Sequence, residues 1–171
     1  MDRLGLEKKA KNGYRLRTDR KEPLVISLAV LSRTFLNFEG IGELVVNHWK
    51  DIGINVYLKV EERSLFFARV RKNDQQLTLW TEPTPNPWAY PETTVPINRQ
   101  NVFAPLVGMW YATDGQKGTA PTGGLKQLLD IFDQGNRIPL EKRGELGKAL
   151  WRVHADNLYA IGIVGNTPAL N

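Results

Sequence analysis

Two apolar runs on either side of an amphipathic stretch constrain the fold of this chain more than any other feature. Residues 24–30 read Leu-Val-Ile-Ser-Leu-Ala-Val, which predicts a buried strand, and residues 54–60 alternate apolar and polar side chains, which predicts a second strand. Between them, apolar residues recur with the spacing of one helical face from Ile41 to Ile52, and Gly53 follows as a cap. Two strands joined by a helix pair in parallel with a right-handed crossover. We therefore expect an α/β fold.

The residues on either side extend this pattern. Ser64 is suited to cap a second helix that places Phe66 and Val70 against the sheet, and residues 76–80 predict a third strand. Ahead of the first strand, alternation from Tyr14 and a turn at residues 19–23 predict a hairpin. The expected order from the first central strand onward is strand, helix, strand, helix, strand.

The periodicity stops between residues 81 and 122, which we interpret as a long loop insertion. Seven of the ten prolines fall there, and so do five aromatic residues, which argue against disorder: Trp88, Tyr90, Phe103, Trp110 and Tyr111. Beyond it, the pattern predicts a helix capped by Thr122, a second helix starting at Pro139, and a last strand over residues 157–164.

Composition excludes several kinds of chemistry. The 171 residues contain no cysteine, which removes disulfides, cysteine-ligated metals and a thiol nucleophile. The longest apolar stretch, residues 24–31, is far too short to span a bilayer. The two histidines, His48 and His154, lie in predicted amphipathic helices, which is typical of helix-face histidines with a local hydrogen bond. No serine stands in a nucleophile-elbow motif. From the cysteines, histidines and serines together, we expect no catalytic residue, no metal and no cofactor.

An aromatic and polar set follows the third predicted strand. Ligands of open α/β sheets bind beyond the carboxyl ends of the strands, and aromatic faces stack on sugar rings or peptide side chains. We therefore expect a ligand-binding site there, formed by Trp80, Glu82, Asn86, Trp88 and Tyr90, with Trp110 added from the same loop. The alternative is that these aromatic residues form a cluster that anchors the long loop.

Several local motifs occur in an order that resembles one family. They are Asn-Gly-Tyr-Arg-Leu-Arg at residues 12–17, Pro-Leu-Val-Ile-Ser-Leu at 23–28, the helix and strand at 41–56, Leu-Thr-Leu-Trp at 77–80, and Trp-Arg-Val-His-Ala-Asp-Asn-Leu-Tyr at 151–159. The chain resembles the bacterial extracellular solute-binding proteins of ABC transporters, family 5, whose members bind oligopeptides, dipeptides or nickel. Peptide-binding members often carry an aspartate after the strand matched by residues 77–80, whereas here the nearest carboxylate is Glu82.

The resemblance implies a lobe of a type II periplasmic-binding-protein-like fold. Residues 1–171 would form a single lobe, a fragment of the carboxyl-terminal half, with the amino-terminal lobe and the export signal missing. The expected ligand is an oligopeptide or an oligosaccharide, captured by hinge closure and delivered to a membrane permease. The expected location is periplasmic or otherwise extracytoplasmic, with a lipid anchor as one form of attachment. An isolated lobe would bind ligand weakly or undetectably, and it would expose a face that favours self-association.

Two other function classes stay open on the residues alone. The net charge of +5 and the basic clusters in residues 8–21 and 69–72 favour a nucleic-acid-binding module, although solvated surface explains the same clusters and the resemblance implies no nucleic-acid partner. An enzyme that uses loop carboxylates is the second alternative; its sign would be raised carboxyl pKa values inside a pocket.

Overall fold

A computed structural model describes residues 2–19, 21–32, 36–81 and 86–165. The chain divides into two compact units, Met1–Thr81 and Glu82–Asn171, and each is described here by itself. None of the helices in the described parts of the chain is long and apolar enough to cross a membrane.

A three-stranded parallel sheet forms the centre of the first unit. Its strands are β1 (Val25–Leu31), β2 (Asn55–Glu61) and β3 (Leu77–Thr78), in the order β2-β1-β3. Val25 pairs with Asn55 and Leu28 pairs with Leu77. The expected α/β class with parallel strands is confirmed, although β3 is shorter than the run over residues 76–80 predicts.

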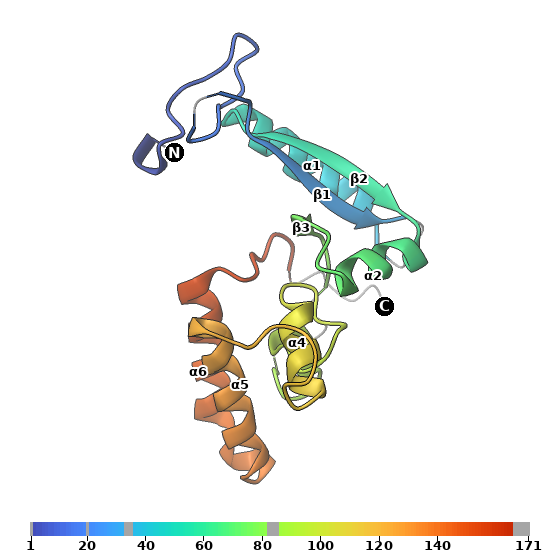
Figure 1. Ribbon diagram of the computed structural model, residues 1–171, viewed down its shortest axis with the longest axis vertical. Helices are drawn as coiled ribbons and strands as arrows, with labels where there is room; N and C mark the ends of the chain where they lie inside the picture. Colours follow the sequence, from blue (N-terminus) through green and yellow to red (C-terminus); the bar gives the residue numbers. More distant parts are fainter. Residues whose placement is uncertain (1, 20, 33–35, 82–85, 166–171) are drawn as a thin grey trace. The chain divides into compact units, whose positions relative to one another are not determined.

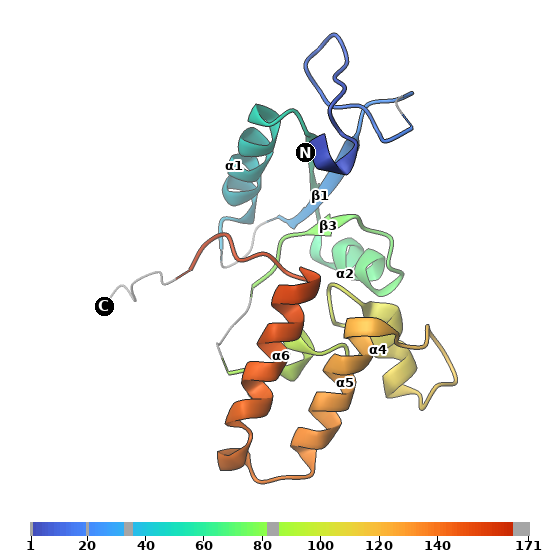
Figure 2. The ribbon, with the colours of Figure 1, turned by 90° about the vertical axis from the view of Figure 1, so that its left-hand side faces the viewer.

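Two helices pack on opposite sides of these strands, as Figures 1 and 2 show. Helix α1 (Phe38–Asp51) approaches β2 so closely that a methyl group added at Gly42 would lie 2.5 Å from a methyl carbon of Leu58. Helix α2 (Arg63–Arg71) buries Phe66 and Val70, as expected. Its cap, however, is Glu62, whose carboxylate accepts the backbone N–H groups of the next residues, and not Ser64. Because Glu62 stands two residues before Ser64, its carboxylate reaches the free backbone N–H groups of Ser64 and Leu65 in the first turn.

The segment before β1 is less regular than a hairpin. After a short 3₁₀ turn, η1 (Asp2–Leu4), two isolated antiparallel bridges join Lys9 to Arg15 and Leu16 to Pro23. The Arg15 side chain donates to the main-chain oxygens of Ile52, at 2.7 Å, and of Leu6, at 2.6 Å. This guanidinium fixes the segment to the end of α1 without a continuous ladder.

The described residues of the second unit, 86–165, contain five helical segments. They are α3 (Pro91–Thr94), α4 (Pro105–Ala112), α5 (Gly123–Asn136), the 3₁₀ turn η2 (Leu140–Lys142) and α6 (Gly144–Asn157). The prediction of an unbroken loop over residues 81–122 is therefore wrong where α3 and α4 lie. Both begin with proline, whose fixed φ and missing N–H suit the first helical position.

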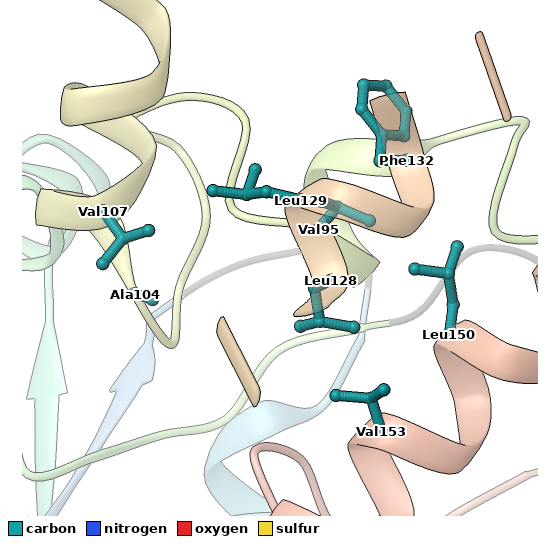
Figure 3. Packing of buried hydrophobic residues seen from close by; sticks show 8 residues of the cluster. All are labelled: Val95, Ala104, Val107, Leu128, Leu129, Phe132, Leu150 and Val153. Atoms are coloured by element: carbon teal, nitrogen blue, oxygen red, sulfur yellow. The ribbon is translucent and has the colours of Figure 1, made fainter. Parts of the chain in front are cut away.

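The core of the second unit lies between α4, α5 and α6. Side chains from these helices and from the residue after α3 converge in Figure 3, and the buried cluster consists of Val95, Ala104, Val107, Leu128, Leu129, Phe132, Leu150 and Val153. The apolar faces predicted for the two long helices are the faces that pack here. Helix α6 begins at Gly144, however, because residues 140–142 form the separate turn η2.

The predicted last strand over residues 157–164 is wrong. Helix α6 continues to Asn157, and Leu158 ends it in a left-handed conformation with φ 53°. No strand occurs among residues 158–165, and Ile161, Ile163 and Val164 are exposed. An apolar run becomes a strand only where a neighbour supplies hydrogen bonds, and the described residues offer none to this run.

Candidate ligand-binding site

Trp80 lies at the carboxyl edge of the first unit's sheet, directly after β3 and Leu79. Its half-buried ring stacks on Phe38 with ring centroids 6.0 Å apart and on Phe66 at 6.1 Å, and it meets Phe67 edge-on at 5.2 Å. Phe38 begins α1, and the other two phenylalanines belong to α2. The Trp80 ring is therefore held in place by the start of α1, the inner face of α2 and the end of β3.

A cation adjoins the same aromatic cluster. The guanidinium of Arg63, the first residue of α2, lies 5.2 Å from the centroid of the Phe67 ring. Arg63 is exposed and Phe67 is half-buried, so this edge offers solvent an aromatic ring with a positive charge over it. Rings of this kind stack on planar or apolar parts of a ligand, and the guanidinium can pair with a carboxylate or hydroxyl group.

A buried carboxylate joins the elements behind this edge. The side chain of Glu61, the last residue of β2, is 2% exposed, and its Oε1 lies 3.2 Å from Lys59 Nζ and 3.3 Å from a terminal nitrogen of Arg69. Its Oε2 accepts a hydrogen bond of 3.0 Å from Gln75. These contacts connect β2 to α2 and to the turn before β3. Glu61 thus has ion-pair partners and Glu62 caps α2, so each of these two adjacent acids has a structural role.

Trp88 packs inside the second unit. Its ring stacks on Phe132 of α5 at 5.9 Å, and the Arg143 guanidinium lies 5.3 Å from the ring centroid. A methyl group added at Gly135 would lie 2.1 Å from the ring, so glycine makes room for it. The indole N–H is buried without a hydrogen-bond partner in the described part of the chain. These contacts resemble the anchoring cluster that the sequence left as the alternative.

Asn86 and Tyr90 flank this anchor. The Asn86 side chain accepts the backbone N–H of Trp88 at 3.1 Å, and the Asn86 carbonyl accepts that of Ala89 at 3.1 Å, which closes a turn. Tyr90 precedes α3, and its carbonyl accepts the hydroxyl of Thr93 at 2.7 Å. The Tyr90 side chain is 53% exposed, so its ring is available to a ligand.

The remaining predicted site residues belong to other parts of the chain. Trp110 belongs to α4, and a methyl group added at Gly115 would lie 3.3 Å from its indole nitrogen. Glu82 lies outside the described residues. The structure thus brings Asn86, Trp88 and Tyr90 together, whereas Trp80 belongs to the first unit.

Sequence reasoning missed the partners of both tryptophans. Phe67 and Arg63 sit on the exposed end of α2, where an aromatic residue four positions after an arginine could have indicated a stacked pair. Phe132 and Arg143 are too far along the chain from Trp88 for any local pattern to indicate them.

The histidines differ from each other in burial. His48 is exposed on α1. His154 is buried on α6, and its Nε2 lies 2.6 Å from the carbonyl oxygen of Thr94. The expected hydrogen bond exists for His154, but it is not local, because the two residues are 60 positions apart.

An open pocket lies at the other end of β2 from the Glu61 network. Its volume is about 280 Å³, and its lining is mostly polar: Lys9, Asn12, Gly13, Tyr14, Lys50, Asp51 and Gly53. In the described residues, no group of three histidine or acidic side chains is arranged to hold a metal ion.

Comparison with known proteins returned no matching family model and no matching curated protein. Solved structures do match. The oligopeptide-binding protein OppA is 25% identical with a TM-score of 0.77, and the match covers 92% of this chain and 27% of that one. The periplasmic binding protein MelB of Agrobacterium fabrum, in complex with stachyose, is 15% identical with a TM-score of 0.70 over 92% of this chain and 24% of its own.

A third similar structure is the periplasmic oligopeptide-binding protein of an ABC transporter from Thermotoga maritima with mannohexaose bound. It is 15% identical with a TM-score of 0.58, over 92% of this chain and 28% of that one. The fold is therefore that of a periplasmic binding protein, and this chain spans about a quarter of the length of such proteins. Within that class, the resemblance to the oligopeptide-binding proteins of ABC transporters is confirmed.

Proposed function

We propose that this chain is part of the carboxyl-terminal ligand-binding lobe of an ABC importer's substrate-binding protein. It would help to capture a peptide or an oligosaccharide outside the cytoplasm and present it to a membrane permease. The observation that carries the proposal is the match to OppA, at 25% identity and a TM-score of 0.77 over 92% of the chain. The role is binding without catalysis, because the similar structures are binding proteins.

The described residues support this proposal with two exposed aromatic sites. One is the Trp80 edge, where Phe67 and Arg63 adjoin the ring, and the other is the turn that carries Tyr90. Aromatic rings stack on sugar rings and on apolar peptide side chains. Either ligand class therefore fits, and the similar structures are named for both.

Hinge closure is the proposed mechanism. A ligand that contacts two lobes stabilises the closed state by its differential affinity and shifts the population toward it. This chain supplies one set of contacts, so we expect its own affinity to be weak, in the millimolar range, at about −4 kcal/mol.

The test uses the five tryptophan side chains as reporters. The chain is labelled with ¹⁵N, and its indole N–H signals are followed while tetrapeptides, stachyose or mannohexaose are added to millimolar concentration. We expect one ligand class to move the signal of Trp80, which reports on the edge of the first unit's sheet, while Trp88 and Trp110 report separately on the second unit. Trp49 of α1 and Trp151 of α6 serve as internal controls and should not move.

Matched variants complete the test. W80F should remove the response of the site, whereas W49F should leave it intact. A response confined to Trp49, or none from any indole with either class, would contradict the proposal. Joining the chain to an amino-terminal lobe should then raise the affinity, and the stabilisation by ligand in a thermal melt would measure it.

A further inference from the structure

Among the described residues, the imidazole of His154 makes one hydrogen bond. Its Nε2 lies 2.6 Å from the carbonyl oxygen of Thr94, and since a carbonyl only accepts, Nε2 carries the proton and donates. In the neutral ring Nδ1 is then an acceptor. Nδ1 is buried and has no hydrogen-bond partner in the described part of the chain, and the residue as a whole is 7% exposed. Protonation would place a proton on a buried nitrogen that has no acceptor among the described residues.

Aromatic rings enclose this imidazole. Phe103 meets it edge-on at 5.3 Å and Tyr159 at 5.9 Å, and these two rings stack on each other at 5.5 Å. Trp151, one turn earlier on α6, lies 5.7 Å away at a tilt. Such surroundings stabilise a neutral ring and offer no anion to a charged one.

The charged and titratable groups around His154 do not compensate its charge. Tyr159 presents a phenol, Glu92 of α3 is half-buried, and Arg152 and Asp156 of α6 are exposed. Burial lowers the pKa of His154 below its ordinary value, and the Thr94 carbonyl offsets only part of this shift. The neutral form is therefore the one that the folded unit accommodates.

The hydrogen bond of His154 fixes a defined piece of chain, residues 90–104, to α6. Thr94 lies at the end of α3 and is fully buried. Further along, Asn101 is 1% exposed; its amide donates to the Glu92 carbonyl at 3.0 Å, and its Oδ1 accepts the backbone N–H of Ala104 at 2.7 Å. His154 ties the start of this segment to the helix, and Asn101 closes the segment on itself. Tyr90 is its first residue.

We propose that neutral His154 is a positioning residue that fastens residues 90–104, and with them Tyr90, onto α6, and that protonation of its ring loosens this segment. The fastening itself follows from contacts within the second unit. Its consequence for ligand capture, weaker binding in acidic surroundings, rests on the proposed function.

The direction of the pH dependence follows from the lowered pKa. His154 is harder to protonate in the folded segment than after the segment is released. Its contribution to the stability of the closed segment is therefore complete above the ordinary histidine pKa of about 6.5, and it is lost as the pH falls toward the lowered folded pKa. Between pH 7.5 and 5.5 the loss can reach about tenfold in the opening equilibrium, since the released ring at pH 5.5 is about ten parts protonated to one part neutral.

Amide hydrogen exchange of the whole 171-residue chain tests the proposal. The probes are the amides of Val95, bonded to the Pro91 carbonyl at 2.6 Å, and of Ala104. After correction for intrinsic rates, we expect their protection to fall several-fold, and by at most about tenfold, from pH 7.5 to pH 5.5. The amide of Ile54 in the first unit, bonded to the Trp49 carbonyl at 2.9 Å, should keep its protection.

The chain's two histidines supply a matched pair of variants. H154Q keeps a neutral N–H donor without a titrating ring, so protection of residues 90–104 should become independent of pH. H48Q changes the exposed histidine on α1 and should keep the wild-type dependence. If protection in the wild type does not change with pH, or changes equally in H154Q, the proposal is wrong.

A second measurement covers the case in which H154Q does not fold. In the unmodified chain, NMR titration of the His154 ring should give a pKa below the ordinary histidine value of about 6.5, with the signals of residues 90–104 following His154. A His154 pKa at or above that ordinary value would overturn the proposal. None of these readouts contains ligand, so an indole titration without response would count against the proposed function alone.

Discussion

The two units of this chain reach compact folds by different means. In the first, residues 24–60 alternate or repeat with a strand or helix period, and the sheet and helices follow that pattern closely. In the second, single side chains join distant segments: Trp88 packs on Phe132, and His154 bonds to Thr94. A fold that follows periodic apolar residues can be predicted from a short window of sequence. A fold that depends on contacts between distant residues can be recognised only from the structure.

Charge separates the units as well. Residues 1–81 contain 15 lysines and arginines against 10 aspartates and glutamates, while residues 82–171 contain eight of each kind. The whole net charge of +5 therefore belongs to the first unit. Part of this positive charge forms contacts within that unit. Lys59 and Arg69 pair with Glu61, and the Arg15 guanidinium donates to main-chain oxygens.

The largest expected effect separates the two units energetically. Leu150 is fully buried where α6 packs on α5, so L150A should destabilise the second unit by about 3–4 kcal/mol through lost burial and a residual cavity. Hydrogen exchange should show the loss in residues 86–165 and leave the first unit's amides protected. L140A, at an exposed leucine of η2, is the matched control. Equal loss in both units would mean that they unfold as one.

The second largest effect concerns the first unit. E61Q removes the charge that Lys59 and Arg69 share, and because those cations are partly exposed, the expected cost is about 3 kcal/mol, at the low end for breaking a buried pair. Denaturant unfolding measures it. E43Q, on the exposed side of α1, should change stability by less than about 0.5 kcal/mol. An E61Q chain as stable as wild type would show that the network contributes nothing.

The next effect in size concerns a contact between α4 and α5, which can be tested at alkaline pH. The Tyr111 hydroxyl donates to Asp133, and burial, followed by this hydrogen bond and the charge of Asp133, raises the pKa of Tyr111 to about 12. The phenol favours its neutral form when folded, so its contribution is complete below the ordinary tyrosine pKa of about 10 and is lost as the pH rises toward 12.

Y111F should therefore cost about 1 kcal/mol at neutral pH and flatten the loss of stability above pH 10. Y57F, at the exposed tyrosine of β2, should keep the wild-type loss. Urea melts at pH 7, 10 and 11 measure both. An unchanged alkaline loss in Y111F would contradict the role of this hydrogen bond.

The smallest effects compare the two arginines that lie over aromatic rings. R63A removes a guanidinium that lies over Phe67 and is exposed, for about 0.5 kcal/mol. R143A removes one that lies over Trp88 and also donates to the Ile138 carbonyl at 3.1 Å, for about 1 kcal/mol. Thermal melts should rank the second variant below the first. The reverse order would mean that the packing of Trp88 does not depend on Arg143.

The parts of the fold that the sequence predicts are those where pattern and packing coincide. Leu128, Leu129 and Phe132 repeat at helical spacing and do face the core. Residues 157–164 are equally apolar, yet they form no strand, because a strand needs a partner and periodicity does not supply one. Pro91 and Pro105 are the first residues of two helices, although prolines in this stretch of sequence indicated a loop.

The candidate site is less predictable for the same reason. Trp80 follows a strand, and that position alone indicates the carboxyl edge of the sheet. Trp88 and Tyr90 are two residues apart and look alike in sequence, but one packs against Phe132 and the other is exposed. Only the residues that contact each ring distinguish an anchor from a surface open to ligand.

The strand order β2-β1-β3 has a consequence for how this protein behaves at high concentration. Within the described residues β2 pairs on one side only, so the backbone groups of alternate residues along this seven-residue strand have no strand partner, and Tyr57 and Val60 are exposed on it. Strands with such edges template aggregation, and native proteins oppose it with charge placed on the edge. The partly exposed Lys59 places a charge on this strand, and so a side chain that pairs with the buried Glu61 within one molecule also discourages a second molecule from adding its strand.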